Sequence, residues 1–105
     1  MNLLFATEEF LEWFRSPKIR PFRSAIVQRL DRLRSGNAGD CRPLRSGVSE
    51  MKINKGPGFR LYFAREGQAV YLLLLGGDKS TQNKDIEKAI AILNREKGNS
   101  HADSI

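Results

Sequence analysis

Apolar residues in the first third of the chain recur at the spacing of helices. Residues 2–6 form a short apolar run that predicts a strand, and Thr7 is a good N-cap for a helix over residues 8–15. A second helix is predicted over residues 21–35, with Gly36 just beyond its end. The positions expected to face the core in these helices are Phe10, Leu11, Trp13, Phe14, Phe22, Ile26, Leu30 and Leu33.

The middle of the chain alternates between apolar and polar residues at the period of β-strands. We predict strands at residues 48–53, 59–65 and 68–75, preceded by a short pairing piece at 42–45. The strand at 68–75 is largely apolar and is therefore expected to be central in the sheet. Gly76-Gly77 is expected to end it.

The last periodic segment predicts a helix that begins at Asn83 or Asp85 and reaches about Lys97, with Gly98 as its stop. Residues 99–105 read as a disordered tail, which leaves residues 1–98 as one domain. Helices early and late, with a mostly antiparallel sheet between them, indicate the α+β class.

Charge is distributed unevenly along the chain. The 105 residues carry a formal net charge of +6, but residues 15–60 hold twelve Lys and Arg against three acids. Such a regional excess is typical of a protein that binds a nucleic acid or an acidic protein, although it also describes an ordinary solvated surface.

Several classes of function are disfavoured by composition. Cys41 is the single cysteine, so an intrachain disulfide is excluded and a reducing cytoplasm is favoured. His101 lies in the polar tail, so we expect neither a Cys/His catalytic pair nor a metal site, and we expect no cofactor. The start of the chain lacks the pattern of a signal peptide, and its longest apolar run, residues 69–75, is too short to span a membrane.

Alternation within the strands places candidate chemistry on one face of the sheet. The odd-numbered residues from 59 to 63 form an apolar face, so Arg60 and Tyr62 share the opposite face, which is expected to be exposed or to line a groove. Glu50 and Lys52 share a face of the preceding strand. If the two strands align, these four side chains converge.

The chain resembles the addiction-module killer proteins of the RelE/HigB superfamily, which are toxins of type II toxin–antitoxin systems. The resemblance covers nearly the whole chain and rests on the order and spacing of short motifs: GNAGD, RPL, GVSEMKI, GPGFRLYF, LLLLGGDKSTQ and DIEKA. It implies a RelE-like α+β fold, with two N-terminal helices packed on an antiparallel sheet. It also implies cleavage of mRNA, often in the ribosomal A site, and neutralisation by a small helix-turn-helix antitoxin.

The resemblance assigns roles to three cations. Arg60 matches the Arg of the family's central strand and suits bidentate contact with phosphate. Lys52 approximately matches a cationic position on the preceding strand, where a Lys among other cations can transfer a proton. Lys79 falls near a basic residue at the end of the last strand and would stabilise the leaving side. Further cations expected to bind RNA are Arg42, Arg45 and Lys55.

One departure from the family keeps alternatives open. Several relatives place Tyr or His near the C-terminus for acid–base chemistry, whereas this chain has a helix without Tyr there, followed by His101. Glu50 or Tyr62 could supply the missing group. The alternatives are a non-catalytic toxin that binds a protein such as DNA gyrase, as ParE relatives do, and a simple RNA-binding module.

Overall fold

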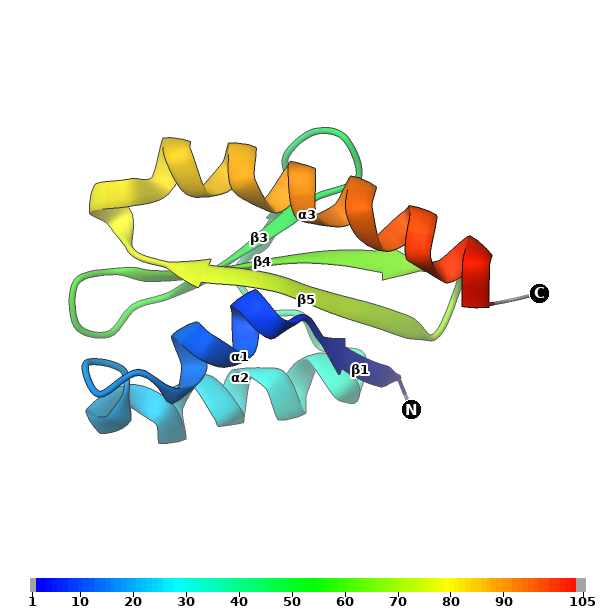
Figure 1. Ribbon diagram of the computed structural model, residues 1–105. Coiled ribbons are helices and arrows are strands. Elements are labelled where there is room, and N and C mark those ends of the chain that lie inside the picture. Colours follow the sequence, from blue (N-terminus) through cyan, green and yellow to red (C-terminus); the bar gives the residue numbers. More distant parts are fainter. Residues whose placement is uncertain (1, 104–105) are drawn as a thin grey trace.

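The computed structural model describes residues 2–103, with side chains through residue 97, and has an α+β fold (Figure 1). Its elements in chain order are β1 (Leu3–Ala6), α1 (Glu8–Arg15), η1 (Arg20–Phe22), α2 (Arg23–Arg34), β2 (Cys41–Pro43), β3 (Ser49–Ile53), β4 (Phe59–Glu66), β5 (Val70–Gly77), η2 (Lys79–Thr81) and α3 (Gln82–Asp103). The predicted α+β class and the C-terminal helix are confirmed. The 3-10 helices η1 and η2 were not predicted.

The five strands form one mixed sheet in the order β1-β5-β4-β3-β2. Strand β1 pairs with β5 in parallel, and the other three neighbouring pairs are antiparallel. Strand β5 therefore lies inside the sheet between β1 and β4, while β4 is the middle strand. Its interior position explains why β5 is almost wholly apolar.

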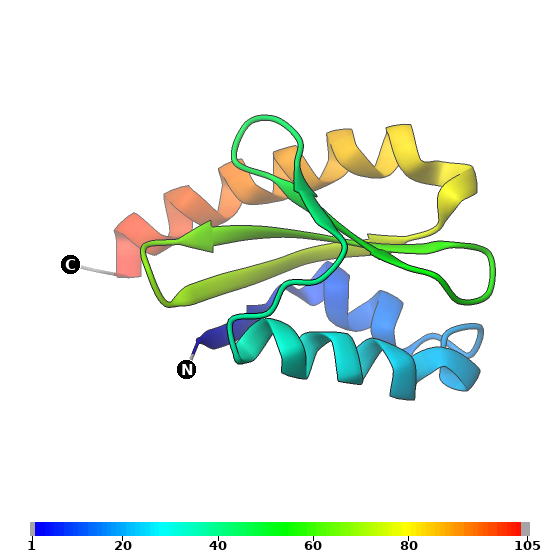
Figure 2. The same cartoon turned by 180° about the vertical axis from the view of Figure 1, so that it is seen from behind.

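Helices cover both faces of the sheet, so the protein has two apolar layers. Helices α1 and α2 lie against one face, and α3 crosses the other (Figures 1 and 2). The first layer joins Phe10 and Ile26 from the helices to Leu61 from the sheet, and the second joins Ala89 and Leu93 of α3 to Tyr62. Trp13 and Phe14 pack against the first layer, as predicted.

A β-bulge in β5 adapts the sheet to α3. Tyr62 pairs with Leu75 and Phe63 pairs with Leu73, so Leu74 has no partner on β4. An extra residue of this kind reverses the alternation of side chains from that point onward. As a result, Leu74 and Leu75 both lie in the layer under α3, where they are 0% and 5% exposed.

The pair Gly76-Gly77 does not break β5, which corrects the sequence prediction, because both glycines belong to the strand. A β-carbon at Gly76 would overlap the indole of Trp13, and one at Gly77 would overlap the carboxylate of Asp85. Glycine is therefore needed because α1 and α3 approach the end of β5 closely from opposite faces.

Helix α3 begins at Gln82, directly after η2, and continues past Gly98 to Asp103. The helix end expected at Gly98 is therefore wrong. A glycine inside a helix costs only about 1 kcal/mol, which is too little to end a helix by itself. Residues 99–103, which were expected to belong to a disordered tail, are the last residues of α3, and residues 104–105 lie outside the described part. Within the described residues, no helix has both the length and the apolar character needed to cross a membrane.

The hydroxyl of Thr7 joins the start of α1 to the bulge in β5 through two buried hydrogen bonds. Its Oγ1 accepts a hydrogen bond from the backbone N–H of Phe10 at 3.1 Å and donates one to the carbonyl of Leu74 at 2.7 Å. We expect Thr7→Val to lower the free energy of unfolding by about 1–3 kcal/mol, because both groups lose a buried partner. Urea denaturation measures this. Thr7→Ser keeps the hydroxyl and should cost much less; equal losses would show that the methyl group matters instead.

Candidate functional site

The strand register brings the predicted side chains together. Lys52 pairs with Arg60 across β3 and β4, and Glu50 pairs with Tyr62. Strand β2 adds Arg42, which pairs with Glu50 from the other side. Since partners in an antiparallel pair lie on the same face, all five side chains share the face that α3 crosses.

The expectation that Arg60 and Tyr62 lie on an exposed face is wrong. Tyr62 is 0% exposed and Arg60 is 7% exposed. The cause is α3, whose apolar residues pack over this half of the sheet together with Leu74 and Leu75. These five side chains form a cluster that α3 largely covers, although Arg42 keeps 59% of its side chain exposed.

Glu50 is the centre of the cluster and is completely buried. Its Oε1 accepts a hydrogen bond from Nε of Arg42 at 3.2 Å, and its Oε2 accepts one from Nε2 of Gln82 at 2.7 Å. The Nε of Arg60 lies 4.0 Å from the same Oε2, an ion pair without a hydrogen bond. One carboxylate therefore links β2, β4 and α3 to β3.

Arg60 is held at its tip by the loop that precedes it. Its Nη1 donates to the carbonyl of Gly58 at 2.6 Å, and its Nε is buried without a hydrogen-bond partner. Its Nη2 has no protein partner among the described residues, yet it is not fully enclosed. Nη2 therefore keeps some access to solvent and has no hydrogen-bond partner among the described residues.

Gly58 brings Lys79 close to Arg60. Gly58 has a φ of +76°, and a β-carbon placed there would lie 3.1 Å from Nη1 of Arg60 and 3.7 Å from Cβ of Lys79. Both side chains therefore flank the same glycine. Lys52 lies beside Arg60 through the strand register, so the three cations predicted as catalytic occupy one region of the molecule.

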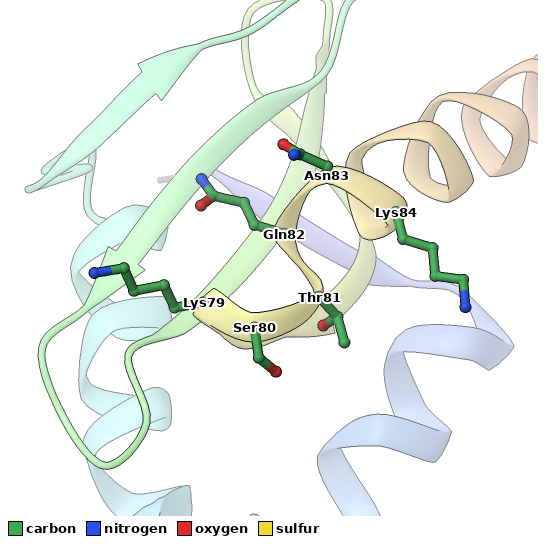
Figure 3. A pocket seen from close by; sticks show the side chains of 6 residues that line it. All are labelled: Lys79, Ser80, Thr81, Gln82, Asn83 and Lys84. Carbon is green, nitrogen blue, oxygen red and sulfur yellow. The ribbon is translucent and has the colours of Figure 1, made fainter.

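Lys79 is exposed and lies at the mouth of a shallow pocket of about 420 Å³, formed by η2 and the first turn of α3 (Figure 3). Asp78 fixes the start of this segment, because its Oδ1 accepts a hydrogen bond from the backbone N–H of Ser80 at 2.8 Å. The pocket is lined by Lys79, Ser80, Thr81, Gln82, Asn83 and Lys84.

The structure separates the cations predicted to bind RNA. Arg42 belongs to the cluster through Glu50. Lys55 is exposed on the loop between β3 and β4, where it lines a smaller pocket beside α2. Arg45 lies in the loop between β2 and β3 and forms an ion pair with Glu87 of α3. Arg45 is therefore engaged on the outer side of the helix.

Tyr62 and Glu50 are poorly placed for proton transfer to a substrate, since both are 0% exposed. The hydroxyl of Tyr62 is buried without a hydrogen-bond partner. Burial raises the pKa of this hydroxyl well above its usual value, and the negative charge of Glu50 raises it further. Tyr62 therefore keeps its proton at neutral pH.

Other reactive residues lie apart from the cluster. The Cys41 thiol donates a hydrogen bond to the carbonyl of Ala38 at 3.0 Å, and burial raises its pKa, which lowers its reactivity. The side chain of His101 falls outside those described. Within the described residues, His, Cys, Asp and Glu side chains form no group of three that could hold a metal ion.

Sequence reasoning missed Gln82, although a signal was present. The polar segment from Asp78 to Gln82 directly follows a buried strand, and such a position brings side chains to the end of the sheet. What the segment could not reveal is the buried acceptor, Glu50, which lies 32 residues earlier in the chain.

The buried charge of Glu50 is expected to stabilise the folded protein. We expect Glu50→Ala to lower the free energy of unfolding by about 3–5 kcal/mol, because Arg60 then stays buried without a counter-charge. The matched control is Glu87→Ala, which removes an exposed partner of Arg45 and should cost about 1 kcal/mol at most. Urea denaturation of both variants measures the difference; similar losses would mean that burial does not strengthen the role of Glu50.

Comparison with known proteins places the chain in a family. No protein-family model matches it, and no solved structure matches it. A protein of Haemophilus influenzae, described as uncharacterized, is 39% identical to it over 83 residues, which cover 79% of this chain and 84% of that protein. The chain therefore belongs to the same family as this Haemophilus influenzae protein.

Proposed function

We propose that this chain is a toxin of the RelE/HigB superfamily, the toxin component of a type II toxin–antitoxin system, and that it cleaves mRNA on the ribosome in the cytoplasm. The observation that carries the proposal is that Arg60 and Lys79 flank Gly58, while Lys52 pairs with Arg60 across β3 and β4. The motif order described above supports the family assignment, and the grouped cations are suited to holding a phosphate.

The chemistry of RNA cleavage without a metal fits these cations. The ribose 2′-hydroxyl gives its proton to a base and attacks the adjacent phosphorus. The bond to the 5′-oxygen then breaks, and an acid gives a proton to that leaving oxygen. Negative charge develops on the phosphoryl oxygens during the attack, and fixed cations stabilise it. In our assignment Nη2 of Arg60 contacts a phosphoryl oxygen, while Lys79 stabilises the leaving side.

Proton transfer is assigned to Lys52 in this proposal. Lys52 is half-buried on β3 beside Arg60. Its side chain makes no hydrogen bond to any described residue. Glu50 and Tyr62 are enclosed, so they would hold the cations in place without touching the RNA. The ribosome would position the mRNA and contribute further groups.

A partner follows from the same surface. Lys79 and Lys55 are exposed, and Arg42 keeps 59% of its side chain exposed although it bonds to Glu50. A small, acidic, helix-turn-helix antitoxin that covers these cations would block the approach of mRNA. An adjacent reading frame that encodes such a protein would support the proposal.

The enclosure of Glu50 and Tyr62 favours a second candidate, a non-catalytic toxin that binds a protein target such as DNA gyrase. Growth arrest with a DNA-damage response and intact mRNA would point to that function. Strongly salt-dependent RNA binding without toxicity would instead indicate a simple RNA-binding module.

Exposed Lys79 gives a cleaner test of cleavage than Arg60, since replacing Arg60 by Ala would also disturb buried Glu50. We expect Lys79→Ala to slow mRNA cleavage by about tenfold or more, because a cation that stabilises the transition state is lost. Primer extension on mRNA from reactions with translating ribosomes measures the rate.

Lys97→Ala is the control for this experiment, because it removes the same charge from an exposed position of α3 near its other end. It should leave the rate unchanged. Uncut mRNA with the wild-type protein would refute the proposed cleavage, and a wild-type rate for Lys79→Ala would remove Lys79 from the site.

A further inference from the structure

Gln82 occupies an unusual position between a buried acid and an open pocket. It is the first residue of α3, half-buried, and its side chain points from the helix toward the sheet between Lys79 and Asn83 (Figure 3). Its amide bonds to Glu50, while the residue also lines the pocket of about 420 Å³. Gln82 thus connects the interior of the cluster to the surface where a ligand would lie.

The orientation of the Gln82 amide is fixed by chemistry. An ionised carboxylate can only accept hydrogen bonds, so the group of Gln82 that faces Glu50 must be the NH₂ and not the carbonyl. Glu50 cannot turn away, because it is fully buried and its other oxygen accepts a hydrogen bond from Arg42. The side-chain carbonyl of Gln82 is therefore directed away from Glu50.

That carbonyl oxygen, Oε1, is free to bind a ligand. Within the described residues, no hydrogen bond uses it, and it is not among the enclosed polar atoms that lack a partner. Among the residues that line the pocket, Lys79 points to the same side as Gln82, whereas Lys84 points away on the other side of the helix (Figure 3). An acceptor with fixed orientation would repel a phosphate at its own position, but it would suit an N–H donor of a ligand whose phosphate lies beside Lys79.

We propose that Oε1 of Gln82 is a specificity-determining acceptor for an amino group of a nucleobase, adenine N6 or cytosine N4, bound in this pocket. The inference rests on the proposed function in one respect, that the ligand is RNA. Guanine and uracil present a carbonyl oxygen at the corresponding position, and two acceptors facing each other repel. The volume of the pocket falls within the range of small-ligand sites.

The test is the binding of short RNAs that differ only in the amino group. Fluorescence anisotropy would measure the affinity of the full chain, at one fixed salt concentration, for labelled 2′-O-methyl pentanucleotides of adenine, purine riboside, cytosine and uracil. The 2′-O-methyl group blocks cleavage, and purine riboside is adenosine without its amino group. We expect adenine to bind better than purine riboside, and cytosine better than uracil, by about three- to tenfold.

Three variants assign the preference to Gln82. Gln82→Met keeps the shape of the side chain but removes the acceptor, so it should equalise the paired affinities while uracil binding persists. Gln68→Met makes the same change in the turn at the far end of β4 and β5 and should keep the preference. Glu50→Gln removes the constraint on the amide orientation and should weaken the preference, and it serves if Gln82→Met fails to fold.

The outcomes separate this inference from the proposed function. Equal binding of all four RNAs would overturn the role of Gln82 and leave the proposed cleavage intact. A preference that survives Gln82→Met would also overturn it, as would loss of uracil binding in a folded Gln82→Met. Selective binding without any mRNA cleavage would support the inference and refute the cleavage. Failure to bind any of the four RNAs would overturn the inference, whereas ribosome-dependent cleavage is tested separately by primer extension.

Discussion

A carboxylate removed from water, that of Glu50, is the constraint on which the candidate site depends. A buried charge is costly unless hydrogen bonds and opposite charges compensate for its lost hydration. Here the compensation comes from three different elements, through Arg42 of β2, Arg60 of β4 and Gln82 of α3. The first turn of α3 is therefore fixed over the sheet at the point where the cations gather, and it does not depend on apolar packing alone.

Two glycines allow this arrangement at the end of β5. Gly76 leaves room for Trp13 on one face, and Gly77 leaves room for Asp85 on the other. Helices α1 and α3 can therefore both approach the strand at the place where it leads into η2 and Lys79. The close packing holds the start of η2 near Gly58 and Arg60, so the position of an exposed lysine is determined by buried contacts.

Local pattern predicted much of the fold, and its failures have a common physical cause. Alternation identified the strands and placed Arg60 with Tyr62 on one face of β4 and Glu50 with Lys52 on one face of β3, because the period of a strand depends on the backbone alone. Three features were missed: the burial of Arg60 and Tyr62, the continuation of β5 through Gly76-Gly77, and the hydrogen bond of Gln82 to Glu50. Each of these depends on where α1 or α3 packs against the sheet, and a contact between residues distant in sequence leaves no local signature.

The buried acid also explains how several cations can share one small region. Lys52, Arg60, Lys79 and Arg42 would repel one another if they were all unpaired, and that repulsion would oppose folding. Glu50 offsets part of this charge and draws Arg42 and Arg60 toward the interior, while Lys79 stays exposed. Arg60 keeps Nη2 near the surface and loses mobility elsewhere. Because these groups are already ordered in the folded protein, the binding of a phosphate at the proposed site would lose less entropy in immobilising them.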